Sequence, residues 1–291
     1  MRKPVSGALP LIVIALLSLP VFAPPAVAQS DSLPLYLRDR GRGIPASIFG
    51  TYVAKGELLI YPFFEYARDH NKEYNTKELG FPLDQDFRGK FRSTAEQIFI
   101  GYGVNDWLAL EFELAYMHAT LEKSPTDPLS PAKITESGLG DFEAQIRARV
   151  RKESPKGPEV FVYGDATLPS NRRKVLIGDK DWDLRPGFGV TKGFSWGTLT
   201  GKIGGEWNRE ESHPILGELA LEYLKRLSPS VRLFLAIEGG EGGAPDEADL
   251  VTGLQWRIKD RVVVKFDNSI GIQSKSPDWV PQLGVMFSLG K

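Results

Sequence analysis

Residues 141 to 151, DFEAQIRARVR, alternate between polar and apolar side chains at every position. The odd positions from Asp141 to Arg151 are polar, and the even positions from Phe142 to Val150 are apolar. A period of two belongs to a β-strand, because successive side chains of a strand point to opposite faces. The apolar face of such a strand meets either a second sheet in a soluble sandwich or lipid in a membrane barrel. The rest of the chain decides between these two folds.

The first residues have the pattern of an export signal. Residues 1–28 combine a positive start at Arg2 and Lys3, an apolar run over 11–22 and the small-x-small ending Ala26-Val27-Ala28, which together predict a cleaved signal peptide. An uncleaved anchor helix is the alternative, but several prolines interrupt the segment and it is short for a span. Cleavage removes two positive charges and no acids, so the formal charge moves from −1 to about −3. This near-neutral balance argues against nucleic acid as a partner.

Segments with the same alternation recur twelve times between residues 57 and 290. Bacterial outer-membrane barrels have an even number of strands, each of ~9–11 residues, and need no long apolar run. We therefore expect residues 57–291 to form an all-β fold, an antiparallel transmembrane β-barrel of about twelve strands. Residues 29–56 would be an N-terminal periplasmic segment or a small plug in the barrel mouth. The chain contains no cysteine, so neither a disulfide nor a cysteine-linked lipid anchor is available.

The connections between these segments alternate in length. Turns such as 105–107 and 259–261 are tight, whereas 67–92, 122–138 and 169–183 are long and polar. Short periplasmic turns and longer extracellular loops, with both termini on the short side, are typical of the outer membrane. The sequence thus predicts that the protein is exported to the cell outer membrane and is surrounded by its lipid.

Aromatic residues lie near both ends of the predicted strands, as in the two interfacial girdles of membrane barrels. The alternative is the scattered core aromatics of a soluble β-protein. The girdle candidates are Trp107, Tyr116, Trp196, Trp207, Tyr223, Trp256 and Trp279.

The last predicted strand has a specific pattern. Residues 282–289, QLGVMFSL, fit the polar-x-Gly-x-x-aromatic-x-apolar signal by which last strands engage the barrel-assembly machinery, although Gly290 and Lys291 follow the usual end point. We expect this machinery to be a partner of the chain.

Several short motifs resemble an outer-membrane barrel family described as meta-pathway phenol-degradation proteins, or simply as transporters. They are 138–141 (GLGD) opening a long strand, 101–107 (GYGVNDW) at a tight turn, 167–169 (TLP) ending a strand and the closing 281–285 (PQLGV). The resemblance implies a barrel that passes small molecules, including hydrophobic or aromatic compounds. It brings no catalytic residues and no cofactor.

The polar faces of the strands are expected to line the lumen. For any single residue, mutual neutralisation inside the barrel is the alternative to shaping a passage. Pairing of Tyr223 with Val231 would set Glu222 opposite Arg232, an arrangement of opposite charges that stabilises a strand pair. The lumen-lining candidates are Glu111, Glu113, Asp141, Glu143, Arg147, Arg149, Arg185, Lys202, Glu222, Arg232, Lys265 and Asp267.

The sequence leaves two alternatives to a channel. One is a structural or adhesive barrel with a plugged lumen, and the other is an enzyme with its active site on the barrel wall. A lipid hydrolase needs a serine beside a histidine on the outer wall. One hairpin register sets Ser93 opposite His118, but it would turn an apolar row into the lumen. A three-residue turn keeps that row on lipid and sets Thr94 opposite His118 instead, and register follows the apolar face. We therefore expect no enzyme.

The sequence also does not support a metal-binding site. No histidine pair has ligand spacing, and Asp179, Asp181 and Asp183 are more typical of a solvated loop than of a calcium site. The sequence predicts no metal and no cofactor. The expected function is passive passage of small molecules through the outer membrane.

Overall fold

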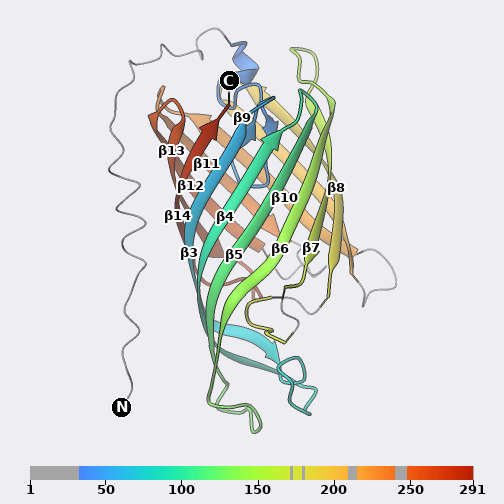
Figure 1. The fold of residues 1–291 in the computed structure, drawn as a ribbon, viewed down its shortest axis with the longest axis vertical. Coiled ribbons are helices and arrows are strands. Elements are labelled where there is room, and N and C mark those ends of the chain that lie inside the picture. Colours follow the sequence, from blue (N-terminus) through green and yellow to red (C-terminus); the bar gives the residue numbers. More distant parts are fainter. Residues whose placement is uncertain (1–32, 171–172, 179–180, 209–214, 240–247, 291) are drawn as a thin grey trace.

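The computed structural model describes residues 33–170, 173–178, 181–208, 215–239 and 248–290 (Figure 1). The expected signal peptide lies outside these residues. Among them, no helix has both the length and the apolar character needed to cross a membrane.

Twelve antiparallel strands close into a barrel, which confirms the predicted fold. The sheet closes where the last strand pairs with the first, with Leu283 opposite Phe64. A separate 3-10 turn, η2 (Leu35–Leu37), and a two-stranded sheet of β1 (Ile44–Pro45) and β2 (Tyr52–Val53) precede the barrel. The barrel strands are β3 (Leu58–Asn75), β4 (Asp86–Gly103), β5 (Leu108–Glu122), β6 (Lys133–Arg151), β7 (Glu159–Leu168), β8 (Asp183–Phe194), β9 (Gly197–Asn208), β10 (Ile215–Arg226), β11 (Val231–Gly239), β12 (Ala248–Lys259), β13 (Val262–Gly271) and β14 (Val280–Leu289).

The two faces of the sheet differ as the alternation predicts. On β5, Phe112 is exposed on the outside while its neighbour Glu111 is buried inside the barrel. On β6, Ile146 and Val150 face outward while Arg147 is buried inside. An apolar exterior around a polar interior is the reverse of a soluble protein and is the surface of an outer-membrane barrel.

The girdle candidates all lie on the outer face, near its two ends. Six of them are about half exposed, and Tyr223 is partly covered by its stacked neighbour Trp196, with ring centroids 5.9 Å apart. At the opposite end, Trp279 contacts Tyr66 edge to face at 6.0 Å. The exposed six are Trp107, Tyr116, Trp196, Trp207, Trp256 and Trp279.

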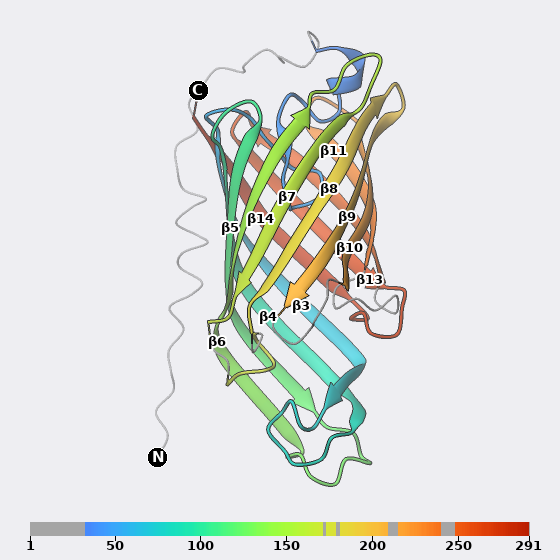
Figure 2. The same cartoon turned by 90° about the vertical axis from the view of Figure 1, so that its right-hand side faces the viewer.

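Two of the predicted long loops are shorter than expected. Since β3 continues to Asn75, β4 begins at Asp86 and β6 begins at Lys133, the connections within 67–92 and 122–138 are 76–85 and 123–132. The four strands β3–β6 thus extend beyond their neighbours at the end opposite the C-terminus (Figure 2). We call residues 69–91 and 121–136 the extension. A buried cluster of Tyr74, Phe87 and Leu121 stabilises it, so its charged residues occupy only part of an amphipathic sheet.

We predict that Leu219→Arg lowers the free energy of unfolding in lipid by about 2–4 kcal/mol, because Leu219 is 55% exposed near the middle of β10 and a guanidinium there would face hydrocarbon. Urea titration of the protein in lipid vesicles measures this. The control is Leu129→Arg at an exposed position of the extension, where a change within about 0.5 kcal/mol is expected. Equal losses in the two variants would contradict a lipid-facing β10.

Candidate functional site

The structure places all twelve lumen-lining candidates on the inner face of the barrel. Their neighbours along each strand, such as Phe142, Ile146, Ile203, Leu221 and Phe266, are exposed on the outside. Several of the inward residues are almost fully buried although they are charged. The most deeply buried are Glu111, Arg147, Arg149, Glu222, Lys265 and Asp267.

These inward side chains are buried because the N-terminal segment occupies part of the lumen. We call residues 39–53, which include β1 and β2, the plug segment. At its centre, the backbone N–H of Ser47 donates to Glu111 of β5 at 2.9 Å, and the Ser47 hydroxyl donates to Gln145 of β6 at 2.8 Å. At its tip, the N–H of Gly50 donates to Glu222 of β10 at 2.9 Å. The segment therefore contacts wall strands on several sides of the barrel.

An ionic cluster holds the start of the plug segment. The guanidinium of Arg40 lies 3.0 Å from the carboxylate of Glu153 and 3.1 Å from that of Glu159. Glu159 also pairs with Arg149 at 2.9 Å, and a second nitrogen of Arg149 donates to the backbone carbonyl of Arg42 at 3.1 Å. The side chains of Arg40, Glu153 and Glu159 are at most 2% exposed. Removing one partner from such a group leaves an uncompensated buried charge.

Apolar contacts also hold the plug segment against the barrel wall. Ile44 and Val53 pack with Leu59 and Ala109 of the wall. Toward the tip, Phe49 stacks with Phe234 of β11 at 6.2 Å between ring centroids. The plug segment thus lies at the end of the barrel next to the C-terminus (Figure 1), where its side chains pack against those of the wall.

The predicted pairing of Glu222 with Arg232 is wrong. Glu222 lies opposite Ala236, and Arg232 lies opposite Arg226. The two registers have the same parity and both keep the apolar rows on lipid, so the alternation does not distinguish them. The turn does, because the N–H of Leu227 donates to the carbonyl of Val231 at 2.9 Å and closes a tighter hairpin. Glu222 is left to bind the plug segment.

In the remaining part of the lumen wall, some acidic side chains have no basic partner among the described residues. Glu65 accepts hydrogen bonds from two neutral amides, those of Gln97 at 3.3 Å and Gln282 at 2.6 Å. Glu113 interacts electrostatically with Glu65, Glu143 and other carboxylates around it. In contrast, four basic residues of the wall are matched to acids: Arg147 to Glu111 at 3.2 Å, Lys202 to Glu218 at 2.5 Å, Lys265 to Asp267 at 2.9 Å and Arg185 to Asp183 at 3.7 Å. Arg232 lies near two other cations, Arg226 and Arg257. The wall therefore presents a carboxylate surplus.

The outer wall contains a serine–histidine contact that the sequence did not indicate. Thr94 does lie opposite His118 across β4 and β5, which confirms the expected register. On the other side, however, His118 lies opposite Ser137 of β6, and its Nδ1 is 2.5 Å from the serine hydroxyl. The sequence predicts a loop over 122–138, which hides the pairing of Ser137 with His118.

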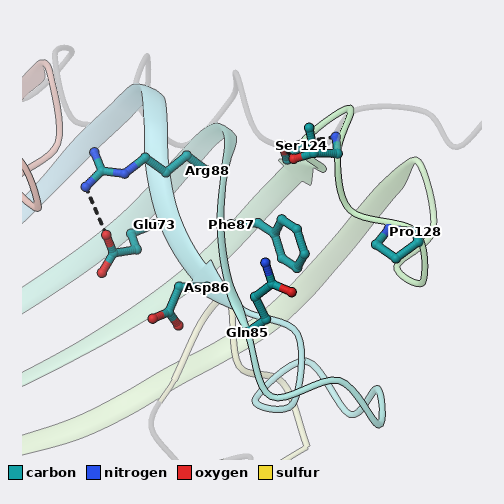
Figure 3. Close-up of a pocket in the computed structure, with 8 residues that line it drawn as sticks. Glu73, Gln85, Asp86, Phe87, Arg88, Ser124 and Pro128 are labelled. Carbon is teal, nitrogen blue, oxygen red and sulfur yellow. Dashed lines mark hydrogen bonds and ion pairs between the residues drawn. The ribbon is translucent and has the colours of Figure 1, made fainter.

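The extension has a polar hollow of its own. A hollow of about 550 Å³ is lined by residues at the adjoining ends of β3 and β4 and by residues of the β5–β6 connection. Figure 3 shows the ring of Phe87 directed toward Ser124 and Pro128, while Arg88 and Glu73 pair on the other side at 2.9 Å. Within the described residues no group of three potential ligands gathers for a metal, and Asp179 of the acidic loop lies outside them.

The comparisons with known proteins concern the fold. No family model and no curated protein matches the chain. An outer membrane channel from Pseudomonas putida F1 is similar in structure, with a TM-score of 0.59, 13% identity, and coverage of 84% of this chain and 99% of that one. The translocator domain of the autotransporter NalP from Neisseria meningitidis gives a TM-score of 0.45 at 12% identity, covering 80% and 88%. The toluene transporter TodX of P. putida gives 0.41 at 7%, covering 88% and 96%.

At such identities a likeness shows the fold alone, and only the first score exceeds 0.5. The chain therefore has the fold of an outer-membrane barrel. The resemblance to the phenol-degradation family stays a prediction, because no family model matches.

We predict that Arg40→Ala releases the plug segment. Two buried carboxylates lose a partner, a loss that typically costs about 3–5 kcal/mol, so amide hydrogen exchange over residues 43–53 should become faster by about two to three orders of magnitude. Mass spectrometry of the exchanged protein measures this. The matched control is Arg38→Ala, because Arg38 is exposed and, among the described residues, its side chain donates only to the carbonyl of Ser195. Unchanged exchange in Arg40→Ala would show that apolar packing alone seats the segment.

Proposed function

We propose that the protein is an outer-membrane channel for passive passage of small molecules, with the plug segment closing the lumen next to the short turns. The observation that carries this proposal is the way the plug segment is held. In the described part of the chain, its strands β1 and β2 pair only with each other, whereas its contacts with the wall are hydrogen bonds that involve side chains, ion pairs and packing. Displacement of the segment would leave the hydrogen bonds of the barrel sheet intact.

The inner wall supports passage of hydrophobic or aromatic compounds, as the family resemblance implies. Buried rings of Tyr61, Phe99, Phe161 and Phe234 face the interior at the level of the plug segment. Lys265 lies 5.7 Å from the ring of Tyr61 and 5.0 Å from that of Phe234. Aromatic faces beside buried charges favour flat solutes that carry both an apolar surface and a polar group.

The carboxylate surplus supports a preference for cations over anions. Rings of acidic side chains raise the local concentration of cations in a narrow passage. Glu65 and Glu113 have no basic side chain within ion-pair distance in the described part of the chain. A small solute with a positive charge would therefore meet a favourable potential.

A permanently closed structural or adhesive barrel is the second candidate. The filling of the lumen by residues 39–53 favours it, as does the extension, which offers a stiff polar surface outside the membrane. Conductance separates the two candidates, because a permanently closed barrel passes no ions.

We also propose that the protein is not an enzyme. A hydrolytic serine–histidine pair needs a third group that orients the imidazole, and among the described residues His118 has only the Ser137 hydroxyl as a hydrogen-bond partner. An assay for fatty-acid release from phospholipid vesicles tests this. Release that disappears in His118→Ala would overturn the proposal.

We predict that Arg40→Ala increases the mean conductance in planar bilayers and the fraction of time spent open, because it weakens the seat of the plug segment without touching the barrel sheet. Arg38→Ala should conduct as the unmodified protein does. If the Arg40→Ala variant shows no conductance although hydrogen exchange shows that the plug segment has been released, the channel proposal fails and the structural barrel is supported.

We predict that, in solutions at pH 9, Glu113→Gln shifts the reversal potential in a potassium chloride gradient toward zero, because one carboxylate of the surplus is lost. The control is Glu78→Gln on the exposed extension, which removes the same charge outside the lumen. A channel that prefers anions before either change would contradict the proposed selectivity.

A further inference from the structure

A groove opens on the outer face of the barrel, on the extracellular side of the aromatic girdle. Its volume is about 220 Å³, and it crosses β4, β5 and β6. Tyr66 forms its edge toward the membrane, and the girdle residue Tyr116 lies one row further in that direction, two residues before His118 of the groove wall. The groove is thus at the level where lipid headgroups surround the barrel.

Three cations of the groove are available to a ligand. Lys90, Arg92 and Lys133 are exposed, and within the described residues no hydrogen bond or ion pair joins their side chains to the protein. Lys90 and Lys133 lie on either side of Glu122 in one cross-strand row, so they are separated by two strand spacings, or about 10 Å. Arg92 lies one row nearer the membrane, at about 6.6 Å along β4.

The surroundings increase this positive charge. Arg68 lies directly opposite Arg92 across β3 and β4. Glu122 is the acid of the groove lining, Glu96 lies beside Tyr116, and Asp278 lies near Arg68. Lys90, Arg92, Lys133 and Glu122 of the groove lining therefore carry a net charge of about +2 at neutral pH.

Neutral donors lie between the cations and the membrane. The hydroxyls of Thr94 and Thr120 line the groove, and the imidazole of His118 is held by the Ser137 hydroxyl at 2.5 Å. Phosphate oxygens accept hydrogen bonds from hydroxyl, imidazole and guanidinium groups alike. The groove thus combines charge and hydrogen bonding suited to a phosphate monoester.

Beyond the row of Glu96 and Tyr116, the outer face is apolar. Ile98, Phe112 and Phe142 follow on the same three strands and are exposed. Phe112 and Phe142 stack at 6.1 Å and form a smooth aromatic surface for acyl chains. A ligand with a phosphate at one end and hydrocarbon at the other would meet both surfaces at once. We infer that this groove binds the phosphate-bearing headgroup of an outer-leaflet lipid.

The groove adjoins the apolar outer face of the barrel that meets lipid. This position favours a phosphate carried by a lipid over a soluble phosphate. Each basic side chain near an anionic membrane surface strengthens binding by roughly fivefold, since the contribution is about 1 kcal/mol per residue. The triple variant Lys90→Gln/Arg92→Gln/Lys133→Gln should therefore bind a phosphorylated lipid at least tenfold more weakly. The matched control is Lys152→Gln/Lys156→Gln/Lys259→Gln, which removes three exposed charges at the short-turn end.

The full-length barrel, refolded in neutral phosphatidylcholine, is titrated with lipid A, a bis-phosphorylated glycolipid, and bound lipid is counted by native mass spectrometry. Heat-modified gel migration verifies that each variant is folded. We expect one lipid A retained by the unmodified protein and the control, and at least tenfold less retention by the groove variant. Equal retention by all three proteins, or an equal loss in both triple variants, would overturn the site. Displacement of lipid A by an equal concentration of inorganic phosphate would overturn the assignment to a lipid.

Discussion

The structure depends on the requirement that every backbone N–H and C=O group within hydrocarbon be hydrogen bonded inside the protein. A sheet meets this requirement only when it has no free edge, which makes the pairing of β14 with β3 the decisive contact of the fold. Once the sheet is closed, each strand has one face on lipid and one on the interior. The period-two pattern of the sequence is the direct consequence, because any residue out of phase would bring a charge to lipid or an apolar group to the lumen.

Closure also creates an interior that the wall alone does not fill. Buried charged groups are costly unless they are paired and hydrogen bonded. In this barrel the plug segment supplies many of the missing partners: Arg40 reaches Glu159, Ser47 reaches Glu111 and Gly50 reaches Glu222. Gly50 has φ 64°, a left-handed conformation that glycine adopts without strain and that turns its N–H toward the wall. The segment and the lumen are therefore one polar network, and neither is complete without the other.

The strand number and the two faces could be predicted from the sequence, because alternation is a local property of each strand. The extension could not, since the charges of residues 67–92 masked the few apolar residues, Tyr74 and Phe87 among them, that carry its buried cluster. The register of β10 and β11 failed for another reason, because registers of equal parity satisfy the alternation equally well. The contacts of the plug segment are non-local: Arg40 and Glu153 are 113 residues apart, and no local pattern joins them. The inward direction of the lumen residues followed from alternation, whereas their partners did not.

The contacts between the plug segment and the barrel wall affect how easily the segment can leave the lumen. An apolar plug of the same size would expose hydrocarbon surface to water on leaving the lumen, at a free-energy cost in proportion to its area. The ion pairs of Arg40 behave differently, because the desolvation that opposes them while they are buried is recovered when water enters. Their net contribution to closure is thus smaller than their number suggests, although their geometry strictly defines the closed position. A segment whose position is fixed by buried ion pairs, and whose charged groups regain hydration on release, is suited to a lumen that opens.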